Sequence, residues 1–222
     1  MTLLIIAIIL IIVAVILFVQ KDGEQTSPEI LIRTLNPDPF QENASTDASV
    51  PMIPWEQRPT KGLLKAFGET VWLILLNPND FFEQLTIKKN IKDPFLFSTC
   101  IYVIVSLMYF LTGSVTNGLM QLAMIVGIFA LTFFMHIWIF LLRGNQGYRG
   151  TFHVIAYTTA PLLFSVVPVI GGIVAGLWTI PLGIIGYKHV HRFGTLTAVI
   201  AFIIGPLTVL LLPLVIAILK QL

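Results

Sequence analysis

The distribution of acidic residues constrains this chain more than any other feature. All eleven Asp and Glu residues lie between Asp22 and Asp93, and none occurs from Pro94 to Leu222. Lys and Arg are sparse as well, so four stretches carry no charge: Met1–Gln20, Pro94–Leu142, Gly150–Tyr187 and Phe193–Leu219. A helix that crosses a membrane needs about 20 apolar residues. The pattern therefore predicts an integral membrane protein.

The overall composition supports this and excludes other classes. Charged residues make up 11% of the chain, whereas a soluble domain has about 25%. Too little charge is available for a water-facing surface, which argues against a soluble enzyme, a disordered protein or a nucleic-acid binder. Cys100 is the one cysteine, which excludes an intramolecular disulfide framework and a multi-cysteine zinc site.

The two longer uncharged stretches each hold more than one helix, because they break near Gly113 and at Gly171-Gly172. Six spans are predicted, near 3–19, 95–112, 118–142, 152–167, 171–187 and 195–219. Helices satisfy the backbone in lipid, and continuous apolar runs do not suit a β-barrel. The expected fold is all-α, a polytopic transmembrane helical bundle with one N-terminal anchor and a five-span domain. The span at 152–167 is short and contains Pro161, so a half-span that re-enters from the cytoplasmic side is an alternative.

Lys and Arg predict the orientation, because they gather on the cytoplasmic side of membrane proteins. With both termini outside, twelve of the thirteen basic residues lie in inner segments and only Lys220 lies outside. The reverse orientation would place twelve outside. We therefore expect a multi-pass protein of the cell membrane, with residues 21–92 in the cytoplasm.

Four regions follow along the chain. Residues 1–20 are predicted as a transmembrane anchor, 21–60 as a Pro-rich cytoplasmic linker, 61–92 as interfacial amphipathic helices and 93–222 as the five-span bundle. The linker holds six of the thirteen prolines, and such a segment buries too little apolar surface to offset its ordering entropy.

The interfacial region shows helical periodicity. One face is predicted to carry Leu63, Leu64, Phe67, Val71, Trp72, Ile74 and Leu75, and the other Lys61, Lys65 and Glu69. A second helix begins at Asn77, a natural N-cap, with Pro78 at its first position. We expect its Phe81 and Phe82 to press into the lipid headgroups.

Small residues predict where the helices pack. Within lipid, helices associate through close backbone approach, which glycine and alanine permit. The fifth span presents such a face in Gly172, Gly176, Gly183 and Gly186, and the sixth presents Ala198 and Ala201. We expect these two spans to contact each other, or one of the faces to dimerise.

Catalytic groups are scarce in the bundle. The absence of any carboxylate there excludes an aspartyl intramembrane protease, an H-E-x-x-H metalloprotease and a carboxylate proton relay. His136, His153, His189 and His191 all fall near the predicted inner leaflet, so a shared metal site is conceivable. Their weak spacing signal favours ordinary polar residues at helix ends. We predict no catalytic residue, metal or cofactor.

Several short motifs resemble those of the Yip domain family. Asn77-Pro78-Asn79-Asp80-Phe81-Phe82 is similar to its N-P-x-x-F-F motif. Tyr157 and Pro161 match a Y-x-x-x-P pattern, and Pro168 and Gly171 match the following I-P-x-I-G. The resemblance covers about residues 70–215.

The resemblance implies five spans and a cytoplasmic N-terminal side. Eukaryotic members interact with Rab-type GTPases, but their long N-terminal cytoplasmic region has no counterpart here, which weakens a carry-over of Rab binding. The short linker and the Ile-rich spans are typical of a bacterial or archaeal member of the family. For such members the resemblance implies no settled activity.

These observations predict a non-enzymatic scaffold that organises the membrane or binds other proteins. Its expected partners are the lipid bilayer and either copies of itself or other membrane proteins, with no nucleic acid. The alternative is a small channel or transporter that uses the kinked helices of spans four to six.

Overall fold

The computed structural model describes residues 52–87, 90–167 and 170–219, with only the helical backbone at 209–219. The predicted anchor at 3–19, the linker up to residue 51 and Pro168 lie outside the described residues. The described part is helical, without a strand, which agrees with the predicted all-α class. Its elements are η1 (Pro54–Gln57), α3 (Arg58–Lys61), α4 (Leu63–Leu76), α5 (Pro78–Gln84), α6 (Lys92–Leu111), α7 (Val115–Leu141), α8 (Gly147–Tyr157), η2 (Ala160–Val166), α9 (Ile170–His191) and α10 (Thr195–Leu219).

Three of the described helices, α6, α7 and α9, are long and apolar enough to cross a membrane. Helix α10 is apolar as well, and its portion Thr195–Thr208 is the part whose side chains are described. The number of six spans therefore remains a prediction, while a helical membrane protein with several candidate spans is what the structure shows.

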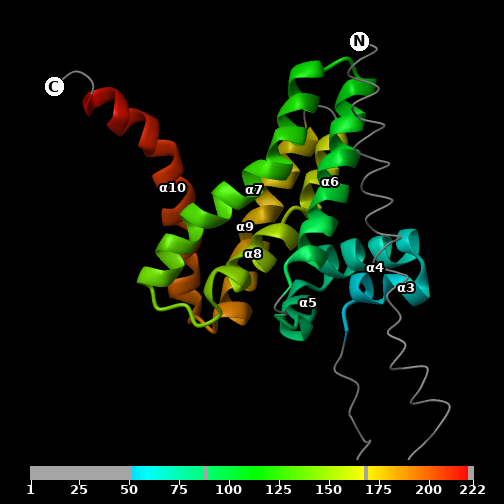
Figure 1. Cartoon of the computed structure of the whole chain (residues 1–222), viewed down its shortest axis with the longest axis horizontal. Helices are drawn as coiled ribbons and strands as arrows, with labels where there is room; N and C mark the ends of the chain where they lie inside the picture. The colour runs from blue at the N-terminus through cyan, green and yellow to red at the C-terminus, as the bar shows by residue number, and fades with distance from the viewer. Residues whose placement is uncertain (1–51, 88–89, 168–169, 220–222) are drawn as a thin grey trace, which may run out of the picture. The chain divides into compact units, whose positions relative to one another are not determined.

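A tight turn joins α6 to α7 (Figure 1). Gly113 adopts a φ of 80° there, a left-handed conformation that glycine reaches without the steric cost of a Cβ. Below the turn, the Ser106 hydroxyl donates a 2.8 Å hydrogen bond to the Gly118 carbonyl. A Cβ on Gly118 would lie 2.5 Å from the Phe110 ring, so the glycine permits this close approach of the two helices.

The segment predicted as one span at 152–167 is instead a broken helix. Helix α8 ends at Tyr157, and the 3₁₀ helix η2 begins at Ala160. Pro161 lies in the first turn of η2, where the backbone N–H has no helical partner in any case. Because proline has no backbone N–H, it cannot donate the hydrogen bond that would continue α8 as an α-helix. The hydroxyls of Thr158 and Thr159 donate to the carbonyls of Ile155 and Ala156 at the break.

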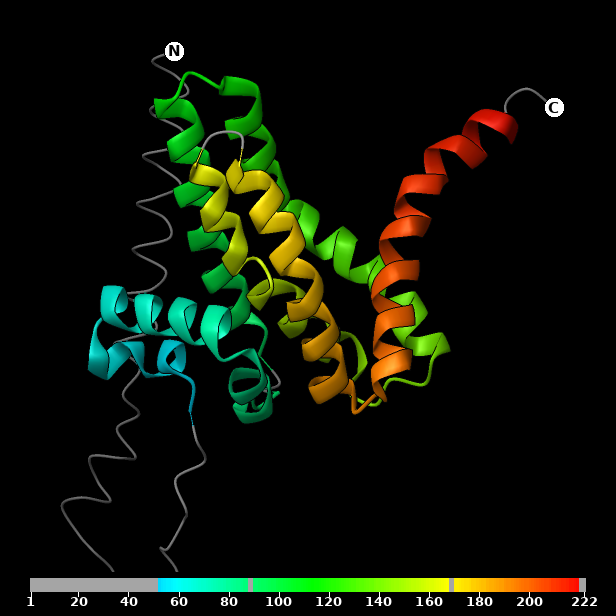
Figure 2. The same cartoon turned by 180° about the vertical axis from the view of Figure 1, so that it is seen from behind.

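The folded unit begins at Ile53 and not at residue 61. Ile53 and Trp55 are buried, which differs from the exposed linker expected up to residue 60. The reason is local, because Pro54 starts η1 and this turn places Trp55 at the N-terminal end of α6. There its indole N–H donates a 2.8 Å hydrogen bond to the Asp93 carbonyl. Figures 1 and 2 both show α4 lying crosswise to α6.

Candidate functional site: the junction of the interfacial helices and the bundle

The motif Asn77–Phe82 forms the start of α5. Pro78 occupies the first helical position and Asp80 lies in the first turn, where a carboxylate is favourable next to the positive helix end. Asn77 stands at the N-cap position, although its side chain forms no capping hydrogen bond. Phe81 and Phe82 are buried within the protein. The expectation that they insert among lipid headgroups is therefore wrong.

An aromatic cluster explains why these phenylalanines turn inward. The Phe81 ring meets the Tyr157 ring edge-on, with 5.0 Å between centroids. Tyr157 in turn packs on Phe97 at 5.1 Å, and Phe97 on Trp55 at 5.6 Å. Such pairs add about 0.5–1.5 kcal/mol beyond their area burial. The cluster joins η1, α5, α6 and α8, so two motifs that are far apart in sequence meet in one core.

Helix α9 packs against the same junction, where it contacts both α8 and α5. A Cβ on Gly186 would lie 2.6 Å from Val154 of α8 and 3.1 Å from the Phe82 ring. The glycine therefore lets α9 approach both α8 and α5. At the exposed edge, His189 Nε2 and Asn79 Oδ1 lie 3.3 Å apart, which links the same two helices α9 and α5.

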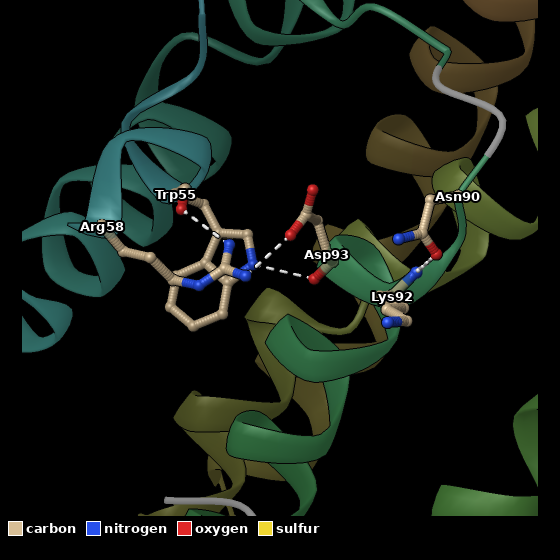
Figure 3. Close-up of polar contacts among 5 residues, drawn as sticks. All are labelled: Trp55, Arg58, Asn90, Lys92 and Asp93. Atoms are coloured by element: carbon tan, nitrogen blue, oxygen red, sulfur yellow. Dashed lines mark hydrogen bonds and ion pairs between the residues drawn. The ribbon is translucent and has the colours of Figure 1, made fainter. Parts of the chain in front are cut away.

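A second connection fastens the segment before α4 to the bundle (Figure 3). Arg58 Nη2 lies 2.8 Å from Asp93 Oδ1, and the two side chains are only 9% and 21% exposed. The Arg58 guanidinium also lies 5.1 Å from the centre of the Trp55 ring, a cation–π geometry. Because Asp93 lies in the first turn of α6, this pair attaches η1 and α3 directly to a candidate membrane span.

The six residues predicted for helix packing fall into two groups. A Cβ on Gly183 would overlap the Phe202 ring of α10, and Ala198 and Ala201 of α10 are buried. Helices α9 and α10 do contact each other. Gly172 and Gly176 are exposed instead, with open space where a Cβ would be.

The remaining motif residues position η2 against the start of α9. Pro161 is buried at the first turn of η2. Gly171 is buried too, and a Cβ there would overlap the Phe164 carbonyl. Only glycine fits at this crossing, so the motif residue is needed for the sharp reversal between the two helices.

The four histidines do not share one centre. His136 Nδ1 and His191 Nε2 both lie near the Thr151 hydroxyl, at 3.0 and 3.3 Å. His153 faces the Arg149 carbonyl, and His189 faces Asn79. Within the described residues, no group of three or more His, Cys, Asp or Glu has the geometry to hold a metal ion.

Apolar side chains of helix α4 lie on two faces, and not on the single face predicted. Ala66, Thr70 and Ile74 are buried against the bundle. Leu64, Trp72 and Leu76 project outward with 85%, 68% and 53% of their surface exposed. We call these three residues the outer stripe. Sequence periodicity alone could not separate the two faces, because both are lined by apolar residues.

The geometry first defines a class of protein: a helical, multi-pass membrane protein in which the short helices before α6 are packed onto a bundle through aromatic and glycine contacts. The Yip1 domain family matches residues 72–217. The chain belongs to this family, which confirms the resemblance seen in its motifs. No curated protein and no solved structure matches the chain.

The sequence analysis assigned Trp55 and Arg58 to the linker, and they also precede the matched residues, so the Arg58–Asp93 connection was missed. One signal was available: a tryptophan followed three residues later by an arginine stands out in a polar, Pro-rich segment. A tryptophan of this kind favours burial wherever its N–H finds an acceptor, and here Asp93 provides one.

Proposed function

We propose that this protein is a non-enzymatic scaffold that organises the membrane from its cytoplasmic surface. One observation carries the proposal: the outer stripe of α4 is exposed on a helix that itself contacts η2 and packs Phe67 on Phe97 of α6. An isolated amphipathic helix could leave the bilayer again, whereas a helix attached to candidate spans stays at its surface.

The physical mechanism is insertion of apolar side chains into one leaflet. Leu64, Trp72 and Leu76 would lie among the headgroups and upper acyl chains, where tryptophan is preferred. Lys65 is exposed on the same helix and can attract anionic lipid by about 1 kcal/mol near the surface. These inserted side chains would enlarge the inner leaflet but not the outer one, and this difference in area favours curvature of the membrane.

The proposal includes the finer features that the sequence predicts. The chain crosses the cell membrane six times, with the broken segment of α8 and η2 as the fourth crossing, with both termini outside and with residues 21–92 in the cytoplasm. Its partners are the bilayer and copies of itself or other membrane proteins, and nucleic acid is not among them. The conformation of the described residues supports a structural role, because the family-motif residues Phe81, Tyr157 and Gly171 all serve packing.

The test compares two double variants after reconstitution into liposomes at a fixed protein-to-lipid ratio. Leu64→Ser with Trp72→Ser removes the apolar character of the outer stripe, whereas Leu64→Ile with Trp72→Phe keeps it. Both positions are exposed, so unfolding free energies should stay within about 0.5 kcal/mol of the wild type. Vesicle diameter is measured by cryo-electron microscopy, and solute release is measured in parallel.

We expect the wild type and the apolar variant to produce smaller or tubular vesicles, and the serine variant to leave them like protein-free liposomes. Unchanged vesicles together with a reproducible solute flux through the wild type would overturn the scaffold and favour the channel or transporter.

A further inference from the structure

A polar cavity of about 570 Å³ lies where α5, the turn before α8 and the end of α9 meet. Ligand sites in proteins commonly have volumes of about 300–1,000 Å³. The cavity is separate from the outer stripe on α4, so its role can fail without affecting the function proposed above.

Opposite charges border this cavity without neutralising each other. Glu83 comes from α5, and Arg192 follows α9. Among residues 52–87, 90–167 and 170–219, neither side chain forms an ion pair. Two charges of opposite sign that share a cavity and stay apart leave room for a ligand that carries both complementary charges.

The Arg192 guanidinium suits a phosphate group. Arginine binds phosphate oxygens with two parallel hydrogen bonds. Gln146 and His189 also line the cavity and offer further polar atoms. Gln146 is the N-cap residue of α8, and the partial positive charge of a helix N-terminus adds to the attraction for an anion.

The Glu83 carboxylate suits an ammonium group, and the apolar lining residues suit hydrocarbon. The Glu83 carboxylate accepts hydrogen bonds from a primary ammonium, whereas a trimethylammonium group has no N–H to donate. Phe82 and Leu85 add an apolar wall. The cavity lies at the basic end of α9, a candidate span, which is the level at which cytoplasmic headgroups meet a positive-inside protein.

We propose that this cavity binds a phosphate linked to a primary ammonium, the headgroup chemistry of phosphatidylethanolamine. Arg192 holds the phosphate, and Glu83 holds the ammonium. The same chemistry exists in free O-phosphoethanolamine, so the experiment examines the lipid and the soluble compound separately.

The full-length protein is purified in detergent and incubated with equal amounts of phosphatidylethanolamine, phosphatidylcholine and phosphatidylglycerol of matched acyl chains. Lipid retained after gel filtration is quantified by mass spectrometry. In a second arm, binding of O-phosphoethanolamine is measured by calorimetry. The variants are Arg192→Gln and Glu83→Gln.

Matched controls are available in the chain itself. Arg143 is an exposed arginine that follows α7, and its φ of 63° is close to the 55° of Arg192. Arg143→Gln therefore places glutamine in the same left-handed backbone conformation as Arg192→Gln does. Glu69 pairs with Lys61 at an exposed position, so Glu69→Gln removes a carboxylate away from the cavity.

We expect phosphatidylethanolamine to be retained about tenfold over the other two lipids, the effect of one charge-assisted hydrogen bond. Arg192→Gln should abolish this retention, Glu83→Gln should remove the preference over phosphatidylcholine, and both controls should keep it. Binding of the soluble compound alone, with the same dependence on both residues, would assign the site to a free ligand. Equal retention of all lipids without O-phosphoethanolamine binding, or a preference for phosphatidylglycerol that Glu83→Gln leaves unchanged, would overturn the proposal.

Discussion

At the scale of single residues, the structure distinguishes two ion pairs that look alike in sequence. Arg58–Asp93 and Lys61–Glu69 each join a basic residue of α3 to a carboxylate further along the chain, at 2.8 and 2.9 Å. The first pair is mostly shielded from solvent, whereas both members of the second are 35% exposed. Exposed pairs contribute about 0–1 kcal/mol, and removing one partner of a shielded pair costs more.

We therefore expect Arg58→Ala to lower the free energy of unfolding by about 1–3 kcal/mol, because it leaves the Asp93 carboxylate without its partner. Lys61→Ala should cost less than about 0.5 kcal/mol. Thermal or denaturant unfolding in detergent measures both. Equal effects of the two substitutions would show that the Arg58 contact does not hold η1 and α3 on the bundle.

The phenylalanines of α5 show why residue-level prediction from sequence is limited. Their helical position was readable from Asn77-Pro78, since Pro78 does start the helix. The direction in which Phe81 and Phe82 point was not, because it depends on Tyr157 and Gly186, which lie far along the chain. A phenyl ring gains comparable free energy in a protein core and in an apolar part of the bilayer.

At the scale of elements, glycines of one stripe on α9 have different surroundings. Gly183 and Gly186 face close neighbours in Phe202 and Val154, whereas Gly172 and Gly176 face open space. The G-x-x-x-G spacing was visible in the sequence, but spacing does not reveal which helix, if any, lies opposite. The dimerisation of that face stays a prediction.

We expect Gly186→Val to destabilise the protein by about 1–3 kcal/mol, since the added methyl groups would collide with Val154 and Phe82. Gly176→Val lies on the same helix, about three turns away, where a Cβ meets open space, so it should leave unfolding of the monomer nearly unchanged. Unfolding in detergent checks the difference, and sedimentation of the Gly176→Val protein reports any change in oligomeric state. Similar destabilisation by both variants would contradict the packing described for α9.

The break between α8 and η2 also shows how far the sequence predicts single elements. Pro161 left a half-span at 152–167 as an alternative from sequence, and the structure builds this segment from two shorter helices. The proline explains why the α-helix ends, but the position of η2 against α6 and α9 depends on tertiary contacts.

At the scale of the whole molecule, the distribution of charge predicts a topology that labelling can test. Asn117 and Asn145 are both exposed and lie near opposite ends of α7. With Cys100 replaced by serine, we expect Asn117→Cys to react with a membrane-impermeant maleimide on intact cells. Asn145→Cys should react only after permeabilisation, because the positive-inside rule places its turn in the cytoplasm. The opposite labelling pattern would reverse the orientation.

The sequence by itself determined that this is a helical membrane protein, because hydropathy and charge govern transfer into a bilayer residue by residue. Its motifs also placed it in the Yip1 domain family. Only the tertiary structure decided which apolar side chains face protein and which stay exposed, as on the two faces of α4. It also decided that Trp55 and Arg58 belong to the folded unit. The physical reason is that lipid tails and a protein interior are similarly apolar, so the hydrophobic pattern cannot separate them and only close packing between distant segments does.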